Sequence, residues 1–236
     1  MNRDRMSSPL WGPAVTLVVL GTVAAGCSTG GSEQPAPAAE PQKVPVAQVC
    51  TGLFPAAGGE ALERVLGSTE FRIRDAQKNP GVRAVAQAME DAYRAGARVR
   101  DMPEATCEVA GEPKGSRFAT ARVRFTAFSK NAADPADLPG VGARDPRVWT
   151  ESKQLYLTYD CVSPRVGSTQ AVPLQIRVLV HAQGGGNEGE AGPGQDQLTV
   201  IHSAALSVAR DLGCANNAGL PEQAQNLPKP GTSVGP

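Results

Sequence analysis

Five cysteines are the residues of this 236-residue chain whose type and spacing best allow chemistry. Four of them are separated by 57, 54 and 53 residues along the chain: Cys50, Cys107, Cys161 and Cys214. Structural zinc sites use cysteines about two to four residues apart, and neither His181 nor His202 lies near a cysteine pair in the sequence. We therefore expect no metal and no cofactor, and the chemistry that remains is disulfide formation or the reactivity of free thiols.

The fifth cysteine, Cys27, ends a segment typical of bacterial export signals. Arg3 and Arg5 give a positive start, and residues 10–26 are apolar apart from two threonines. The segment closes with Ala24-Ala25-Gly26-Cys27, which resembles a lipobox, where small residues admit the signal peptidase and the cysteine thiol takes a diacylglycerol. We expect residues 1–26 to be a signal peptide and Cys27 to carry the lipid. The alternatives are a signal peptide without lipid and a retained membrane helix, which Gly12, Pro13 and Gly21 disfavour.

Residues 27–45 predict a disordered tether, because they are rich in Gly, Ser, Pro, Gln and Glu and show no apolar periodicity. The whole chain has 23 basic and 23 acidic side chains, a balance that argues against nucleic acid as a partner. Removing the signal peptide leaves a charge of about −1, which offers no polybasic attraction to a membrane. The lipid on Cys27 is therefore the expected membrane anchor.

Export and an even count of four remaining cysteines favour two disulfides. Four cysteines permit three pairings. We favour Cys50–Cys107 with Cys161–Cys214, because each bond then ties a helix end to a nearby strand. Pairing Cys107 with Cys161 and Cys50 with Cys214 is the alternative. A loop of fifty-odd residues closed in this way stabilises the fold by about 4 kcal/mol on the chain-entropy model.

Apolar residues at helical spacing predict three helices. The first covers Gly59–Leu66, and the second runs to Gly96 from an N-terminal cap at Asn79-Pro80. The third covers Asp196–Leu212 and carries a continuous apolar stripe: Leu198, Ile201, Ala205, Val208 and Leu212.

Alternation of apolar and polar residues predicts strands near residues 71–73, 105–109, 119–127, 155–161 and 172–180. Since each strand has one polar side, we expect an α+β fold, in which helices pack on one face of an antiparallel sheet. The expected domain covers residues 46–215, residues 183–195 form a loop, and residues 216–236 form a flexible tail.

Two groups of residues are candidates for binding. Trp149 lies with Arg144 and Arg147 in a long segment, 129–150, that joins two strands, and an aromatic residue beside arginines is a common contact patch. The alternative is that Trp149 folds back onto the sheet edge or the core. Five further arginines belong to predicted strands and align either as a solvated face or as a surface for an acidic partner or anionic wall polymer: Arg72, Arg74, Arg122, Arg124 and Arg177.

Sequence motifs for catalysis are missing. The glycines at 184–186 are not followed by a Lys-Ser/Thr pair, as a phosphate loop requires, and the chain has no Gly-x-Ser-x-Gly motif. His181 and His202 are most simply surface or boundary residues, although a pair of carboxylates needs no local motif. We expect no catalytic residue.

Val49-Cys50-x-x-Leu53-Phe54, followed by Ala61-Leu62-x-x-Val65-Leu66-Gly67, resembles small actinobacterial cell-envelope lipoproteins that carry a cysteine-bearing domain of unknown function. The resemblance implies a PsbP-like α+β fold and a second cysteine in an early strand, which Cys107 matches. It carries over no catalytic residue.

These observations predict a lipoprotein on the outer face of the cytoplasmic membrane that binds an envelope protein or ligand and is not an enzyme. A small extracytoplasmic enzyme with a scattered site and an accessory subunit of an envelope complex are the alternatives.

Overall fold

The computed structural model describes residues 42–73, 75–96, 104–112, 119–129, 146–184 and 194–232. Cys27, the expected signal peptide, Arg74 and Arg144 lie outside these ranges. The strands are β1 Gln42–Pro45, β2 Glu70–Ile73, β3 Ala105–Gly111, β4 Thr120–Ser129, β5 Arg147–Glu151, β6 Gln154–Cys161, β7 Leu174–Gln183 and β8 Gly231–Thr232. The α-helices are α1 Ala56–Leu66, α2 Val82–Arg94 and α3 Gln195–Asp211, and the short 3-10 helices are η1 Val46–Gln48, η2 Ala76–Lys78, η5 Ala215–Gly219 and η6 Ala224–Asn226.

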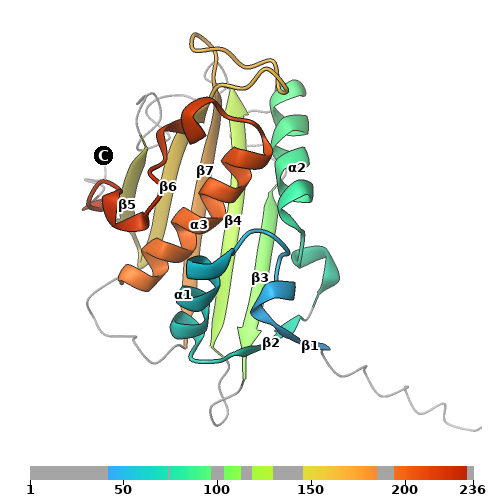
Figure 1. The fold of residues 1–236 in the computed structure, drawn as a ribbon, viewed down its shortest axis with the longest axis vertical. Coiled ribbons are helices and arrows are strands. Elements are labelled where there is room, and N and C mark those ends of the chain that lie inside the picture. Colours follow the sequence, from blue (N-terminus) through green and yellow to red (C-terminus); the bar gives the residue numbers. More distant parts are fainter. Residues whose placement is uncertain are drawn as a thin grey trace, which may run out of the picture. The chain divides into compact units, whose positions relative to one another are not determined.

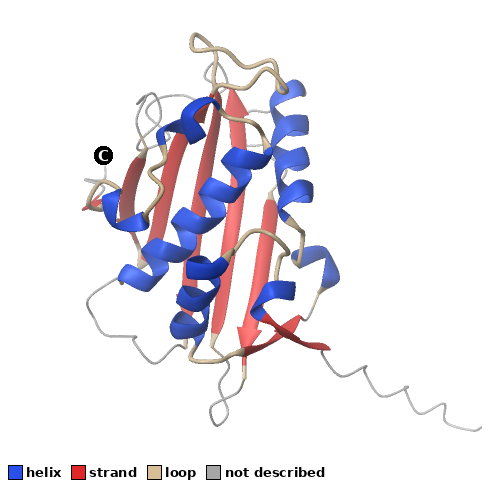
Figure 2. Ribbon diagram, in the orientation of Figure 1, coloured by secondary structure: helices blue, strands red, loops and turns tan. Residues whose placement is uncertain are grey.

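All eight strands belong to one sheet in the order β1-β2-β3-β4-β7-β6-β5-β8. Neighbouring strands are antiparallel except for β5 and β8, which run parallel. Strands β4 and β7 pair over ten residues at the centre of the sheet. The three α-helices all lie on one face of this sheet, as Figures 1 and 2 show, so the expected α+β class is confirmed.

The hydrophobic core lies between the sheet and the helices. Alternate residues of the central strands are fully buried there, including Phe125 on β4 and Ile176 on β7. The predicted stripe of α3 faces the sheet, and Ile201, Ala205 and Leu212 have no exposed surface. Helix α1 packs against α3, and the backbone at Gly58 approaches Ser203 so closely that a side chain at position 58 would overlap it.

The start of α2 differs from the expected Asn79-Pro80 cap. The helix begins at Val82 behind Gly81, and no side chain caps it. Asn79 instead uses its Oδ1 to accept a hydrogen bond from the Cys50 N–H at 2.5 Å. Asn79 thus holds the turn that contains Cys50 against η2, and does not cap α2.

The domain is longer at both ends than the sequence indicates. Residues 42–45, expected in the tether, form β1, because Val44 pairs with Phe71 and lies on the core side. The expected flexible tail also packs on the domain, and four of its apolar residues are buried: Ala218, Leu220, Ala224 and Leu227. Leu220, Ala224 and Leu227 lie four and three residues apart, but Pro221 and Pro228 interrupt the segment, so this spacing did not indicate a helix.

Candidate functional site

The four domain cysteines form two disulfides, Cys50–Cys107 and Cys161–Cys214, with Cα–Cα distances of 6.0 and 5.1 Å. This is the favoured pairing of the sequence analysis, which is therefore confirmed. None of the four residues is more than 7% exposed. The first bond joins the turn after η1 to β3, and the second joins the end of β6 to Cys214, three residues beyond the end of α3. Both bonds hold elements in place and neither presents a reactive thiol.

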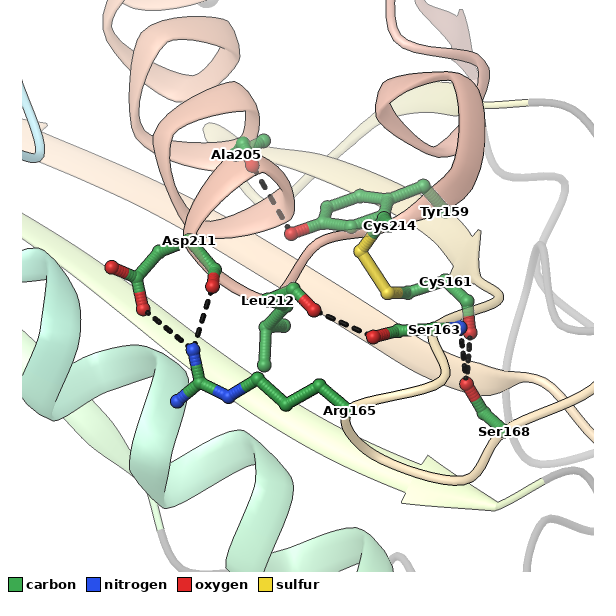
Figure 3. Close-up of a disulfide and its surroundings, with 9 residues drawn as sticks. All are labelled: Tyr159, Cys161, Ser163, Arg165, Ser168, Ala205, Asp211, Leu212 and Cys214. Carbon is green, nitrogen blue, oxygen red and sulfur yellow. Dashed lines mark hydrogen bonds and ion pairs between the residues drawn. A yellow bond between two sulfur atoms is a disulfide. The ribbon is translucent and has the colours of Figure 1, made fainter.

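Hydrogen bonds surround the Cys161–Cys214 disulfide (Figure 3). The Ser163 hydroxyl donates to the Leu212 carbonyl at 2.6 Å, and the Ser168 hydroxyl donates to the Cys161 carbonyl at 2.9 Å. The Tyr159 hydroxyl donates to the Ala205 carbonyl at 3.2 Å. Complete burial raises the pKa of the Tyr159 phenol far above its ordinary value, so this group stays protonated. The cluster fixes the end of α3 to β6.

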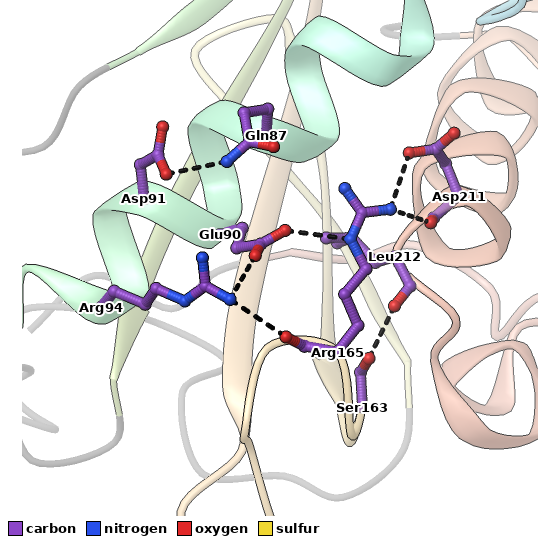
Figure 4. Close-up of polar contacts among 8 residues, drawn as sticks. All are labelled: Gln87, Glu90, Asp91, Arg94, Ser163, Arg165, Asp211 and Leu212. Atoms are coloured by element: carbon purple, nitrogen blue, oxygen red, sulfur yellow. Dashed lines mark hydrogen bonds and ion pairs between the residues drawn. The ribbon is translucent and has the colours of Figure 1, made fainter.

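Arg165 ties the loop 162–173 to two helices (Figure 4). Its Nε lies 3.0 Å from Glu90 on α2, and its Nη1 lies 2.7 Å from the Asp211 carbonyl on α3. Arg94 contacts the other Glu90 oxygen at 2.5 Å and also donates to the Arg165 carbonyl. Glu90 is 4% exposed, and its two arginine partners offset part of the cost of burying its carboxylate. These charges are satisfied by one another, which makes the cluster structural.

The sheet face turned away from the three α-helices, here called the far face, carries the polar side chains of the strands. The strand register places these groups in cross-strand rows. One row runs Trp149, Tyr156, Leu179, Arg124, and the next runs Arg147, Thr158, Arg177, Thr126. Strand neighbours lie about 4.8 Å apart, so side chains of adjacent rows can contact one another.

The cations on the β1–β4 half of the far face are paired with glutamates. Arg72 lies 3.4 Å from Glu112, Arg122 lies 2.9 Å from Glu108, and Arg124 lies 3.1 Å from Glu104. Lys43 also contacts Glu112, at 2.9 Å. Its hydrogen bond, together with that of Arg72, lowers the pKa of Glu112. The expected row of arginines is thus largely neutralised on this half.

The β5–β7 half holds a cluster of Trp149, Tyr156 and Arg177. The rings of Trp149 and Tyr156 stack with their centroids 5.0 Å apart and their planes 7° from parallel. The Arg177 guanidinium carbon lies 5.6 Å from the centre of the Trp149 ring, within cation–π range. Trp149 is 6% exposed, and Arg144, the third residue of the expected contact patch, lies outside the described residues, so the patch of Trp149 with Arg144 and Arg147 stays a prediction. Trp149 packs on the sheet, as the alternative proposed, but on the far face, while Arg147 is exposed two residues away.

Several polar atoms of this cluster are enclosed without a hydrogen-bond partner. They are Nε and Nη2 of Arg177, Nε1 of Trp149 and Oε1 of the neighbouring Gln175. Burial lowers the pKa of Arg177, and electrostatic interactions with Tyr156 and Glu151 oppose that shift. Burial and Glu151 raise the pKa of Tyr156. Tyr156 therefore stays protonated at neutral pH and donates to Gln154 Oε1 at 2.6 Å.

The two histidines have structural partners. His202 is 4% exposed, and its Nε2 donates to the Pro221 carbonyl at 2.7 Å, which holds the C-terminal segment against α3. Burial lowers the pKa of His202, and the bond to Pro221 offsets part of that shift. His181 Nε2 lies 2.7 Å from the Gln183 amide nitrogen. In the described ranges neither ring is hydrogen-bonded to a serine or a carboxylate, as a catalytic pair requires.

Within the residues that the structure describes, no three His, Cys, Asp or Glu side chains are grouped to hold a metal ion, and no helix is long and apolar enough to span a membrane. No model of a known family matches the chain, and neither a curated protein nor a solved structure is significantly similar to it. The resemblance to actinobacterial envelope lipoproteins stays a prediction.

The sequence named Trp149 and Arg177 separately but did not bring them together. Alternation gave a usable signal, since Arg147 and Trp149 are two residues apart and so lie on the same side of a strand. The contact with Arg177 depends on the register of β5, β6 and β7, which no local pattern specifies.

Proposed function

We propose that the protein is a lipid-anchored, extracytoplasmic binding protein of a bacterial cell envelope. In this proposal Cys27 anchors the chain on the outer face of the cytoplasmic membrane, and the partner binds at the Trp149–Tyr156–Arg177 cluster. The lipobox-like segment supports the anchor. The two disulfides support an oxidising compartment, because such bonds persist outside the cytosol and are rare within it.

One observation carries the choice of surface. Four cations of the β1–β4 half of the far face are paired with glutamates, whereas Arg177 has no ion-pair partner among the described residues and lies on an aromatic stack. Tryptophan, tyrosine and arginine are the residue types that contribute most binding energy at protein interfaces. The cluster contains no activated nucleophile and no free base, since the Tyr156 hydroxyl stays protonated, and this favours binding over catalysis.

Site-specific photo-crosslinking tests the proposal. A photoreactive amino acid at Arg147, which is exposed beside Trp149, is compared with the same group at Arg83, which is exposed on α2. After irradiation of intact cells, the membranes are solubilised in detergent and the adducts are identified by mass spectrometry. We expect one dominant adduct at position 147, absent at position 83 and at least tenfold weaker when Arg177 is replaced by Met.

Equal adduct yields at positions 147 and 83 would reject this surface. So would an adduct yield at position 147 that Arg177→Met leaves unchanged. A stoichiometric membrane complex that survives Arg177→Met would favour the accessory-subunit alternative. A small-molecule product formed by the purified protein from an envelope extract, and lost in Arg177→Met, would favour the enzyme alternative.

A further inference from the structure

Three enclosed hydrogen-bond donors in the Trp149–Tyr156–Arg177 cluster lack an acceptor. They are Nε and Nη2 of Arg177 and Nε1 of Trp149, and Arg177 lies over the Trp149 ring at 5.6 Å. Buried donors in native proteins are almost always bonded, because an unpaired one costs its full desolvation energy. Three such donors in one contact group point to an acceptor that comes from outside the chain.

The charge balance of the cluster indicates which acceptor fits. Arg124, the next arginine on the far face, is already paired with Glu104 at 3.1 Å, and Glu151 adds a negative charge near Arg177. Among the described residues Arg177 has no direct ion-pair partner, and the negative charge of the nearby Glu151 disfavours a doubly charged phosphate more than a singly charged carboxylate. A carboxylate is also planar and accepts two parallel bonds from the fork of a guanidinium group.

Gln175 adds an acceptor to the same side of β7, two residues before Arg177. Its amide nitrogen donates to Asp160 at 3.0 Å, which fixes the orientation of the amide, and its Oε1 is enclosed without a partner. A ligand with an N–H next to its carboxylate would satisfy both Gln175 and Arg177. The last residue of a peptide has this combination of groups.

We infer that Arg177 and Trp149 bind the carboxylate of a peptide, with Gln175 accepting the peptide N–H. This inference rests on the proposed function, since it names the chemical group that the proposed surface recognises. The stacked rings of Trp149 and Tyr156 provide the apolar surface beside the carboxylate.

The test uses N-acetylglycine, which has a carboxylate next to an amide N–H, and N-acetylglycinamide, which lacks the carboxylate. The processed protein, labelled with ¹⁵N in detergent micelles, is titrated while the Trp149 indole and Arg177 Nε signals are followed by NMR. Trp149→Phe and Arg177→Lys assign these two signals. We expect saturable shifts with N-acetylglycine and a dissociation constant on the order of 1–30 mM, as suits so small a ligand. Acetate should bind more weakly, and N-acetylglycinamide should cause no saturable shift.

The variants separate recognition from general charge effects. Arg177→Lys keeps the positive charge but loses the two parallel N–H donors of the guanidinium group. Both Arg177→Lys and Arg177→Met should weaken the binding of N-acetylglycine at least tenfold. Arg122→Lys is the matched control on the same face, since Arg122 is already paired with Glu108, and it should bind as the parent does. Thermal melting of each variant reports whether it is folded.

Linear, non-saturating shifts, or equal shifts with N-acetylglycinamide or with sodium chloride, would overturn the inference. So would unchanged binding in folded Arg177→Lys. If crosslinking at position 147 still captures a partner in that case, the proposed surface stands and only its chemistry is wrong. If N-acetylglycine binds but no adduct forms, the carboxylate site stands and the partner-binding function fails.

Discussion

Replacing Gly58 by alanine is expected to push α1 away from α3. A Cβ at this position would overlap both Cβ and Oγ of Ser203, well inside the 3.4–4 Å of ordinary contact. Ser203 cannot rotate its own Cβ away, so the two helices must separate by on the order of 1 Å in a close-packed core. Overpacking of this kind costs about 1–3 kcal/mol, and alanine regains up to about 1 kcal/mol over glycine in a helix. We expect a net loss of about 1–2 kcal/mol in the free energy of unfolding.

The assay is urea unfolding of a double-mutant cycle with Gly58→Ala, Ser203→Gly and the combined variant. Ser203→Gly removes the overlapping Cβ, so the double variant should be more stable than the sum of the single changes by at least about 1 kcal/mol. Gly59→Ala is the matched control on α1. Its Cβ would lie 3.3 Å from Val46 and from the Phe54 carbonyl, which small shifts accommodate, so its stability should stay within about 1 kcal/mol of the parent.

Additive effects, to within about 0.5 kcal/mol, together with a Gly58→Ala variant as stable as the parent, would refute the close approach of α1 to α3. The same result would imply that the helix layer can shift on the sheet without cost.

The other predictions concern location, oxidation, pH and the C-terminal segment. Cys27→Ser should move the protein from the membrane fraction to the medium or leave an unprocessed precursor, and a processed variant that stays on the membrane would contradict the lipid anchor. Alkylation without reductant should add no mass to the four domain cysteines, and label on two or more would contradict the disulfides. The pKa of His202 is lower in the folded than in the unfolded chain, so the unfolded chain takes up a proton first, and the free energy of unfolding should fall as the pH drops below about 6.5. His202→Gln keeps a hydrogen-bond donor for the Pro221 carbonyl but does not titrate. Urea titrations should therefore show a smaller fall between pH 7.5 and 5.5 for this variant than for the parent. Removing residues 218–236 deletes buried Leu220 and Leu227 and should cost roughly 3 kcal/mol or more, whereas removing residues 233–236 should leave the melting temperature unchanged.

The elements with a strong period were predictable. Apolar residues recur every three or four positions along α3 and at alternate positions along β4 and β7, because one side of each element is buried. The sequence alone therefore predicted these elements and the α+β class. The disulfide pairing followed from where those elements end. Strand β5 was missed, because it lies at the end of the segment 129–150 that the sequence analysis expected to be a loop. Its five residues are too few to show a clear alternation of apolar and polar residues next to the glycines and prolines of that segment.

What sequence could not supply depends on register and on docking. Strands β1 and β8 contain four and two residues, and each exists because a neighbouring strand offers its edge. The packing of Leu220 and Leu227 is fixed by contacts with the finished domain and not by a local period. Likewise, the meeting of Arg177 with Trp149 needs the pairing of three strands, and the ion pairs that neutralise the other arginines come from separate strands or loops.

Strands β1 and β8 have a consequence for how copies of this protein behave together. A sheet edge with free N–H and C=O groups is a template for pairing with another sheet, and it promotes aggregation. Here the two edge strands are short terminal segments: β1 pairs with β2 along four residues, and β8 pairs with β5 only at Trp149 and Thr150. Very short edge strands expose few free backbone groups, so they offer a poor template for a second sheet. If the proposed lipid anchor holds copies at high local concentration on one membrane, these short edges would limit pairing between their sheets.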